Sequence, residues 1–254
     1  MRLLKETEYP WLWETVRNLC RKSKVPIPKV ALVRSGTPNA FVFGRTPSSA
    51  TLAVTQGLLN MLTKDEVRAV VAHEIGHIKH KDMIVMTVVA VIPVIAYFVG
   101  RFMIFAPRRD EKGRTGAAIL VGIAAFVIYF ISNLLVLALS RLREYYSDRF
   151  AGRNIKPSLL AGALAKITYG LSMYRGKESS AVRSFFIADP ITAASEVSML
   201  SSQYKDLELS EKDLKEAMEW EKKNPFIRFS EIFRTHPLTY KRIMALKEME
   251  KKSD

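Results

Sequence analysis

Two long uncharged apolar runs dominate the pattern of hydrophobic and polar positions along the chain. The first covers the 18 residues from Met83 to Gly100 and resumes after Arg101, and the second covers the 25 residues from Gly116 to Ser140. Because an α-helix rises about 1.5 Å per residue, roughly 20 apolar residues cross the hydrocarbon core of a bilayer. Both runs are therefore predicted to be membrane-spanning helices joined as a hairpin. The alternative is a pair of buried core helices in a soluble protein.

The part of the chain before this hairpin carries helical and extended patterns in turn. A helix is predicted over residues 6–24, ahead of a proline. Short runs rich in valine, phenylalanine, leucine and alanine, separated by glycine and proline, predict three strands over 29–34, 40–43 and 50–55. Thr63 and Glu66 match a capping box, so a further helix is predicted from Lys64 to about His80.

The part after the hairpin is predicted to be mainly helical. The second span should continue as a helix over 141–151. Further helices are predicted over 157–169, 210–222 and 237–250, with a polar, irregular segment over 173–190. The expected fold class is therefore an α+β membrane protein, mainly helical, with a small β-sheet and a two-helix transmembrane hairpin. Its three parts are residues 1–82, 83–140 and 141–254.

Composition and charge narrow the function classes. The chain of 254 residues has 39 Lys and Arg against 25 Asp and Glu, a net charge of +14, and one cysteine, Cys20. A single thiol excludes an intrachain disulfide and favours a reducing compartment. The sequence contains no zinc finger and no RNA-binding signature, so no nucleic-acid partner is expected. The first sixteen residues carry charges throughout, which does not fit a cleavable signal peptide.

The basic residues also predict an orientation. Eight Lys and Arg residues flank the outer ends of the two spans, against four in the linker 107–115. The positive-inside rule then places both soluble parts in the cytoplasm. We expect a multi-pass protein of the cell membrane whose basic excess faces anionic lipid.

The candidate chemistry lies in the capped helix, as His73-Glu74-Ile75-Gly76-His77. Histidines four residues apart lie on one helical face, so both imidazoles can reach one metal ion. Glu74, beside the first histidine, can act on a water at that metal without ligating it. This HExxH spacing predicts a zinc peptidase site.

A catalytic zinc ion usually has three protein ligands, and the third must come from elsewhere. Glu144 is the preferred candidate because it directly follows the second span and returns to the membrane face of the HExxH helix. Asp148, four residues further along the chain, is expected to orient a ligating histidine by contacting the ring nitrogen that does not bind the metal. His80 and Asp148 remain alternative third ligands.

The motifs in combination resemble the HtpX membrane zinc metalloproteases, which are relatives of the CAAX prenyl proteases. The resemblance covers roughly residues 1 to 250 and implies a zincin-like protease fold. Members usually carry two further hydrophobic segments ahead of the soluble part, and this chain begins after the place where they would end. Besides the HExxH, the resemblance rests on Asn39-Ala40-Phe41, Arg143-Glu144-Tyr145-Tyr146-Ser147-Asp148, Thr235-His236-Pro237 and Arg242-Ile243.

The resemblance also implies roles for individual residues. His73, His77 and Glu144 would bind one Zn²⁺ per chain, and Glu74 would be the catalytic carboxylate. The segment from Asn39 through Ala40 and Phe41 to Phe43 would be an edge strand that holds the substrate backbone by strand addition.

Metal chemistry then predicts a mechanism. Zinc lowers the pKa of a bound water toward about 7 and polarises the scissile carbonyl. Glu74 would take the proton and pass it to the leaving amine. The oxyanion needs a further partner, for which we favour His236 over Asn39.

The sequence thus predicts a zinc endopeptidase embedded in the bilayer. Its expected partners are polypeptides, above all misfolded or damaged membrane proteins, and lipid; its oligomeric state is left open. Two alternatives remain, a catalytically silent zinc-binding scaffold and a protease that processes prenylated proteins. The intact Glu74 disfavours the scaffold, since scaffolding makes no demand on that carboxylate, and two spans suit prenyl-protein processing poorly.

Overall fold

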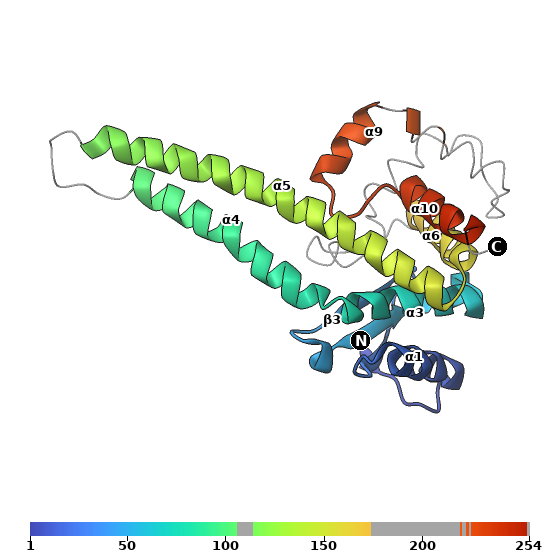
Figure 1. The fold of residues 1–254 in the computed structure, drawn as a ribbon. Helices are drawn as coiled ribbons and strands as arrows, with labels where there is room; N and C mark the ends of the chain where they lie inside the picture. Colours follow the sequence, from blue (N-terminus) through green and yellow to red (C-terminus); the bar gives the residue numbers. More distant parts are fainter. Residues whose placement is uncertain (106–113, 174–218, 220–221, 224, 253–254) are drawn as a thin grey trace.

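The computed structural model describes residues 1–105, 114–173, 219, 222–223 and 225–252. A long two-helix hairpin projects from a body made of a small sheet and several helices (Figure 1). Both the predicted irregular segment 173–190, apart from its first residue, and the predicted helix 210–222, apart from residues 219 and 222, lie outside the described residues. The architecture matches the expected mainly helical α+β class.

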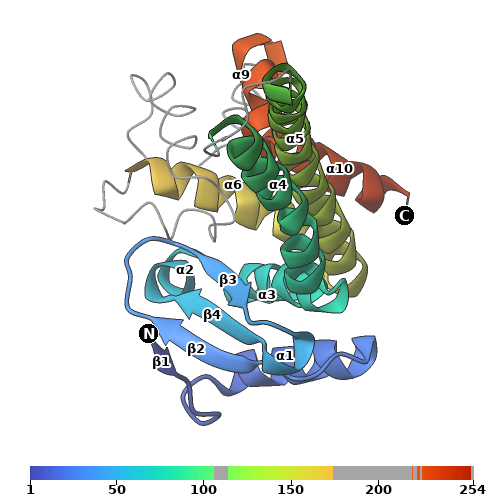
Figure 2. The same ribbon diagram turned by 90° about the vertical axis from the view of Figure 1, so that its left-hand side faces the viewer.

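A four-stranded mixed sheet forms one side of the body, with the strand order β1-β2-β4-β3. β2 and β4 run parallel, whereas β3 pairs with β4 in antiparallel register, for example Phe41 opposite Ala53. β3 is an edge strand, as expected, and lies on the side of the sheet nearest to α4 (Figure 2). The strands are β1 (Arg2–Leu3), β2 (Lys29–Val33), β3 (Ala40–Phe43) and β4 (Thr51–Thr55).

The three predicted strands are confirmed to within one residue at each end. β1 was not predicted, because two residues carry no readable alternation. The short 3-10 turn η1 (Pro47–Ser49) precedes β4.

Three helices precede the hairpin: α1 (Pro10–Ser23), α2 (Gln56–Met61) and α3 (Lys64–Lys79). The prediction that the first helix begins at residue 6 is wrong, because the helix begins with Pro10 in its first turn, a position that proline favours. α2 escaped prediction since it has only six residues; the Thr55 hydroxyl caps it by accepting from the Leu58 N–H. α3 begins as predicted, with the reciprocal capping box of Thr63 and Glu66.

The hairpin consists of α4 (Asp82–Phe105) and α5 (Arg114–Asn154). Only 17% and 11% of the most apolar windows of these helices are buried. The alternative of two core helices therefore does not fit, since apolar surface on this scale needs a non-aqueous environment. The two helices approach closely where Gly122 faces α4, since a Cβ there would lie 2.5 Å from Ile104 Cγ1. Small residues at such crossings are typical of packed membrane helices.

Beyond the hairpin, α5 continues unbroken into the body, as predicted for residues 141–151. Three further helices and one 3-10 turn follow among the described residues: α6 (Pro157–Met173), α9 (Pro225–Ser230), η3 (Glu231–Phe233) and α10 (Thr239–Lys251). α6 and α10 were predicted, whereas the short α9 was not. The main core joins side chains of α1, β2, β4, α3, α6 and α10.

α3 lies at the centre of the body and packs against α1, α5 and α6. Eleven of its sixteen residues are buried. Its closest approach to α5 is at Gly76, where a Cβ would lie 3.0 Å from Ser147 Cα and 3.1 Å from Ser147 Oγ. The absence of a side chain at Gly76 thus sets the separation of the two helices.

We expect Gly76→Ala to force α3 and α5 apart by a few tenths of an ångström. The free energy of unfolding should fall by about 1–3 kcal/mol, the usual range for overpacking. Thermal unfolding of the detergent-solubilised chain measures this effect. Gly116→Ala is the matched control, because a Cβ there meets nothing within 4 Å. Equal unfolding temperatures for the two variants would contradict the tight contact.

Candidate metal centre

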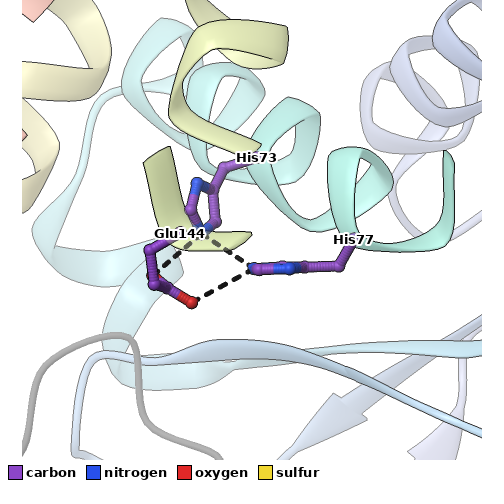
Figure 3. Close-up of side chains that lie close together, drawn as sticks. All are labelled: His73, His77 and Glu144. Atoms are coloured by element: carbon purple, nitrogen blue, oxygen red, sulfur yellow. Dashed lines mark hydrogen bonds and ion pairs between the residues drawn. The ribbon is translucent and has the colours of Figure 1, made fainter. Parts of the chain in front are cut away.

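Two histidines of α3 and one glutamate of α5 point toward a common centre (Figure 3). The Nε2 atoms of His73 and His77 are 3.1 Å apart. Glu144 Oε1 lies 3.5 Å from His77 Nε2, and Glu144 Oε2 lies 3.6 Å from His73 Nε2. All three donor atoms fall within 4.8 Å of one another.

Local structure explains how residues 67 or more positions apart meet here. The i, i+4 spacing places His73 and His77 on the same face of α3. The close crossing at Gly76 brings α5 against that face, and Glu144 lies almost one helical turn before Ser147 on α5. The structure therefore brings together the three metal ligands proposed from the sequence.

The two alternative third ligands lie elsewhere. His80 is the C-cap residue of α3, and its ring packs against the rings of Tyr146 and Phe150. Asp148 lies behind His73, with its Oδ1 2.9 Å from His73 Nδ1. That contact is on the opposite side of the ring from the nitrogen that faces the centre, so Asp148 orients His73, as expected.

A second carboxylate, Asp82, does the same for His77. Asp82 Oδ2 lies 2.6 Å from His77 Nδ1. The chain reaches this position through Lys81, whose φ of 57° breaks the helix and starts α4 in a new direction. Sequence reasoning missed Asp82, although its place between the HExxH and the first span was a usable signal.

Arg143 of α5 fixes Asp82 in turn. Its guanidinium forms an ion pair with the Asp82 carboxylate. It also donates to the carbonyl oxygen of His80 at 2.7 Å, which satisfies a backbone acceptor at the end of α3. At their body ends, both helices of the hairpin therefore contact α3, α4 through Asp82 and α5 through Arg143.

Arg242 of α10 is the largest fully buried side chain of the body, with an exposed fraction of 2%. It donates to both oxygens of Asp148, at 2.8 Å from Nε and 2.6 Å from Nη2. Its Nη1 lies 3.1 Å from Glu144 Oε2. Burial alone would lower the pKa of Arg242, but the Asp148 and Glu144 carboxylates outweigh it and raise the pKa above its ordinary value. The sequence resemblance included Arg242 without assigning it this role.

Glu74 is buried beside the centre, at 3% exposure. Burial raises the pKa of its carboxyl to about 8, and the neighbouring Glu144 acts in the same direction, while His77 opposes both. His73 is also buried, and burial lowers its pKa, which favours the neutral imidazole that ligates metals.

Both groups line a cavity of about 530 Å³. One wall is formed by Phe41, Val42 and Phe43 of β3 with Gly44 directly after the strand, and the start of α4 contributes Met83 and Met86.

The remaining residues proposed from the sequence occupy different surroundings. His236 lines the cavity, and its Nδ1 lies 3.3 Å from Glu144 Oε2. Phe41 also lines the cavity. Asn39 and Ala40 are buried at 1% and 0% exposure and are not among the lining residues. The Asn39 backbone instead pairs with Thr55 of β4.

The donor set fits a metal ion. Two imidazole nitrogens and one carboxylate oxygen, all buried or half-buried and turned toward one point, form the ligand set of catalytic zinc sites that keep one position open. Carboxylates behind both histidines complete the arrangement, because ligating imidazoles commonly donate their second N–H to an acid.

Comparisons with known proteins agree with this geometry. The model of peptidase family M48 matches residues 6–250. A protease HtpX homologue of Methanothermobacter thermautotrophicus is 45% identical over 170 residues, covering 66% of this chain and 63% of the relative. The homologue of Thermococcus sibiricus is 35% identical over 260 residues, covering 98% and 76%.

The fold has a counterpart among solved structures. The crystal structure of S. mikatae Ste24p superimposes with a TM-score of 0.56 at 16% identity, covering 92% of this chain and 49% of that protein. This chain spans less than two thirds of the length of the Methanothermobacter relative and about half of Ste24p. The family match over nearly the whole chain and the HtpX relatives lead to one conclusion: the chain belongs to peptidase family M48.

Proposed function

We propose that this protein is a membrane-bound zinc endopeptidase that cleaves misfolded or damaged membrane proteins at the cytoplasmic face. One observation carries the proposal: three potential metal-ligating side chains and a buried glutamate share one cavity with the edge strand β3. The family match supports the reaction class.

His73, His77 and Glu144 would hold the ion. When bound, zinc supplies a Lewis acid that polarises the scissile carbonyl and makes water a better nucleophile near neutral pH. Asp82 and Asp148 keep the Nδ1–H of each histidine engaged, so that Nε2 stays free to ligate.

Glu74 is the proposed proton carrier. Its carboxyl is buried and lines the same cavity as the three potential ligands, so it lies within the space where a water at the ion would be held. It removes a proton from the attacking water and delivers it to the amine nitrogen as the peptide bond breaks.

His236 is the proposed donor to the oxyanion. Its ring lines the cavity and its Nδ1 lies 3.3 Å from Glu144 Oε2, while its buried Nε2 has no hydrogen-bond partner among the described residues. An N–H at Nε2 would suit the charge that develops on the carbonyl oxygen.

β3 is the proposed substrate-binding strand. It is an edge strand of the sheet, and an extended peptide can add to a sheet on that side. Phe41 and Phe43 line the cavity beside Met83 and Met86 of α4, so the wall that a substrate side chain meets is mostly apolar.

The membrane location and orientation complete the proposal. Met83 and Ser140, at the body ends of the two apolar runs, both line the cavity, which supports a reaction next to the bilayer surface. The excess of basic residues at these ends supports a cytoplasmic orientation of that surface. Substrates that emerge from the membrane are the polypeptides closest at hand.

Replacing Glu74 by Gln should leave zinc bound and lower casein cleavage by about 10²- to 10⁴-fold, because the proton carrier is lost while the ligands remain. Zinc content and turnover of the purified chain in detergent check this. Glu248→Gln, at an exposed position of α10, is the matched control and should cleave normally. Undiminished turnover in the Glu74 variant would refute the mechanism.

Replacing Glu144 by Ala should remove zinc together with activity, because two histidines alone hold the ion weakly. Metal analysis after gel filtration measures the stoichiometry. A Glu144 variant with one full equivalent of zinc would show that the third ligand lies elsewhere.

Replacing Asp82 by Asn should weaken zinc binding by about 10- to 100-fold, because His77 loses the acid that orients its ring. Competition with a chelator of known affinity gives the zinc dissociation constant. Asp65→Asn, in the exposed first turn of α3, is the control. Equal affinities in these two variants would mean that Asp82 serves the fold alone.

A further inference from the structure

The segment formed by α9 and η3 exposes an unusual number of large apolar side chains. Ile227 faces inward and packs with Leu238 and Tyr240 in a small core of its own. Four side chains on the outside, here called the aromatic face, have exposed fractions of 41% to 77%. The aromatic face consists of Phe226, Phe229, Ile232 and Phe233.

Hydrogen bonds fix the position of this segment along α5. Arg141 donates to the carbonyl oxygens of Ile232 at 3.2 Å and Arg234 at 2.8 Å. Arg141 is the first charged residue after the 25 uncharged residues of the second run. The aromatic face is therefore held at the level where the apolar run of α5 ends.

The arrangement of the helices is consistent with this position of the aromatic face at the end of the apolar run. α9 lies alongside α5, on the side away from α4 and the sheet, in Figure 1. α4 and α5 also expose apolar side chains at their body ends, among them Ile84 and Leu142. The aromatic face thus lies near a part of the hairpin that is itself apolar and exposed.

The charges of the segment suit an anionic surface. Arg228 lies between Phe226 and Phe229 in sequence and is exposed, and the exposed Lys222 and Lys223 precede the helix. Large apolar side chains interleaved with basic residues at the end of a membrane span are typical of segments that lie in the headgroup layer.

We propose that α9 and η3 dip into the interfacial layer of the bilayer, with phospholipid covering the aromatic face. A soluble partner is disfavoured because Arg141 holds the face at the end of an apolar run whose own side chains are exposed. The inference rests on the membrane assignment of α4 and α5, but not on the proposed peptidase activity.

A spin label on Phe229→Cys in the full chain tests this, in nanodiscs of phosphatidylcholine and phosphatidylglycerol. The native Cys20 does not interfere, because it is fully buried and burial raises the pKa of its thiol to about 11. The measurement compares collisions of the label with oxygen, which concentrates in lipid, and with a water-soluble nickel chelate. Phe233→Cys provides a second reporter should Phe229→Cys fail to fold.

Two matched controls set the scale. Val127→Cys, at a position 53% exposed on the hairpin, reports lipid, and Lys247→Cys, on an exposed position of α10, reports water. We expect the label at position 229 to favour oxygen over the nickel chelate, as at 127 and unlike 247.

Three outcomes would overturn the inference. A label at 229 that collides with the nickel chelate as at 247 would place the face in water. A label shielded from both reagents would show that protein covers the face, either a second copy or another part of the chain. Aqueous signals at both 229 and 127 would remove the membrane assignment itself, which separates this failure from that of the peptidase mechanism.

Discussion

The buried guanidinium of Arg242 is the constraint on which the metal site depends. Asp148 and Glu144 are both buried, and two carboxylates so placed need a cation close by to remain charged. Arg242 supplies it from α10, close to the opposite end of the chain from α3. The site is therefore complete only when α3 and α10 have both docked on α5.

The Nδ1 atoms of His73 and His77 have their carboxylate partners in different parts of the molecule. Asp148 holds His73 from within the body, whereas Asp82, at the first residue of α4, holds His77. Arg143 of α5 forms an ion pair with Asp82, so this pair links α4 to α5 at the base of the hairpin. The position of the hairpin and the orientation of one metal ligand are consequently coupled. A displacement of the hairpin relative to the body would therefore also disturb the orientation of His77.

Much of this site could be predicted from sequence, because its central elements have strong local signals. The i, i+4 histidines and the capping box at Thr63 define α3, and two uncharged runs define the hairpin that returns Glu144 to the same face. Asp82 and Arg242 were not assigned roles in this way, although Asp82 stands between the HExxH and the first span. Each is a charged residue flanked by others on a helix, a pattern that indicates a solvated surface, and only tertiary packing shows that both are buried. The six residues of α9 were missed because one short helix has too few positions to show a period.

The uninterrupted course of α5 has a consequence for which chains the site can reach. Glu144 lies four positions after Ser140, the last residue of the uncharged run, which corresponds to about 6 Å along a helix. With the run in a bilayer, α5 would hold Glu144 at a fixed distance from the bilayer surface. A peptide bond would have to lie at that distance from the surface to reach the site. A compact domain would be kept out by its own bulk, since the lipid surface leaves it no room to approach. An extended segment lying along the membrane meets no such obstacle, so selection by shape would precede any recognition of side chains.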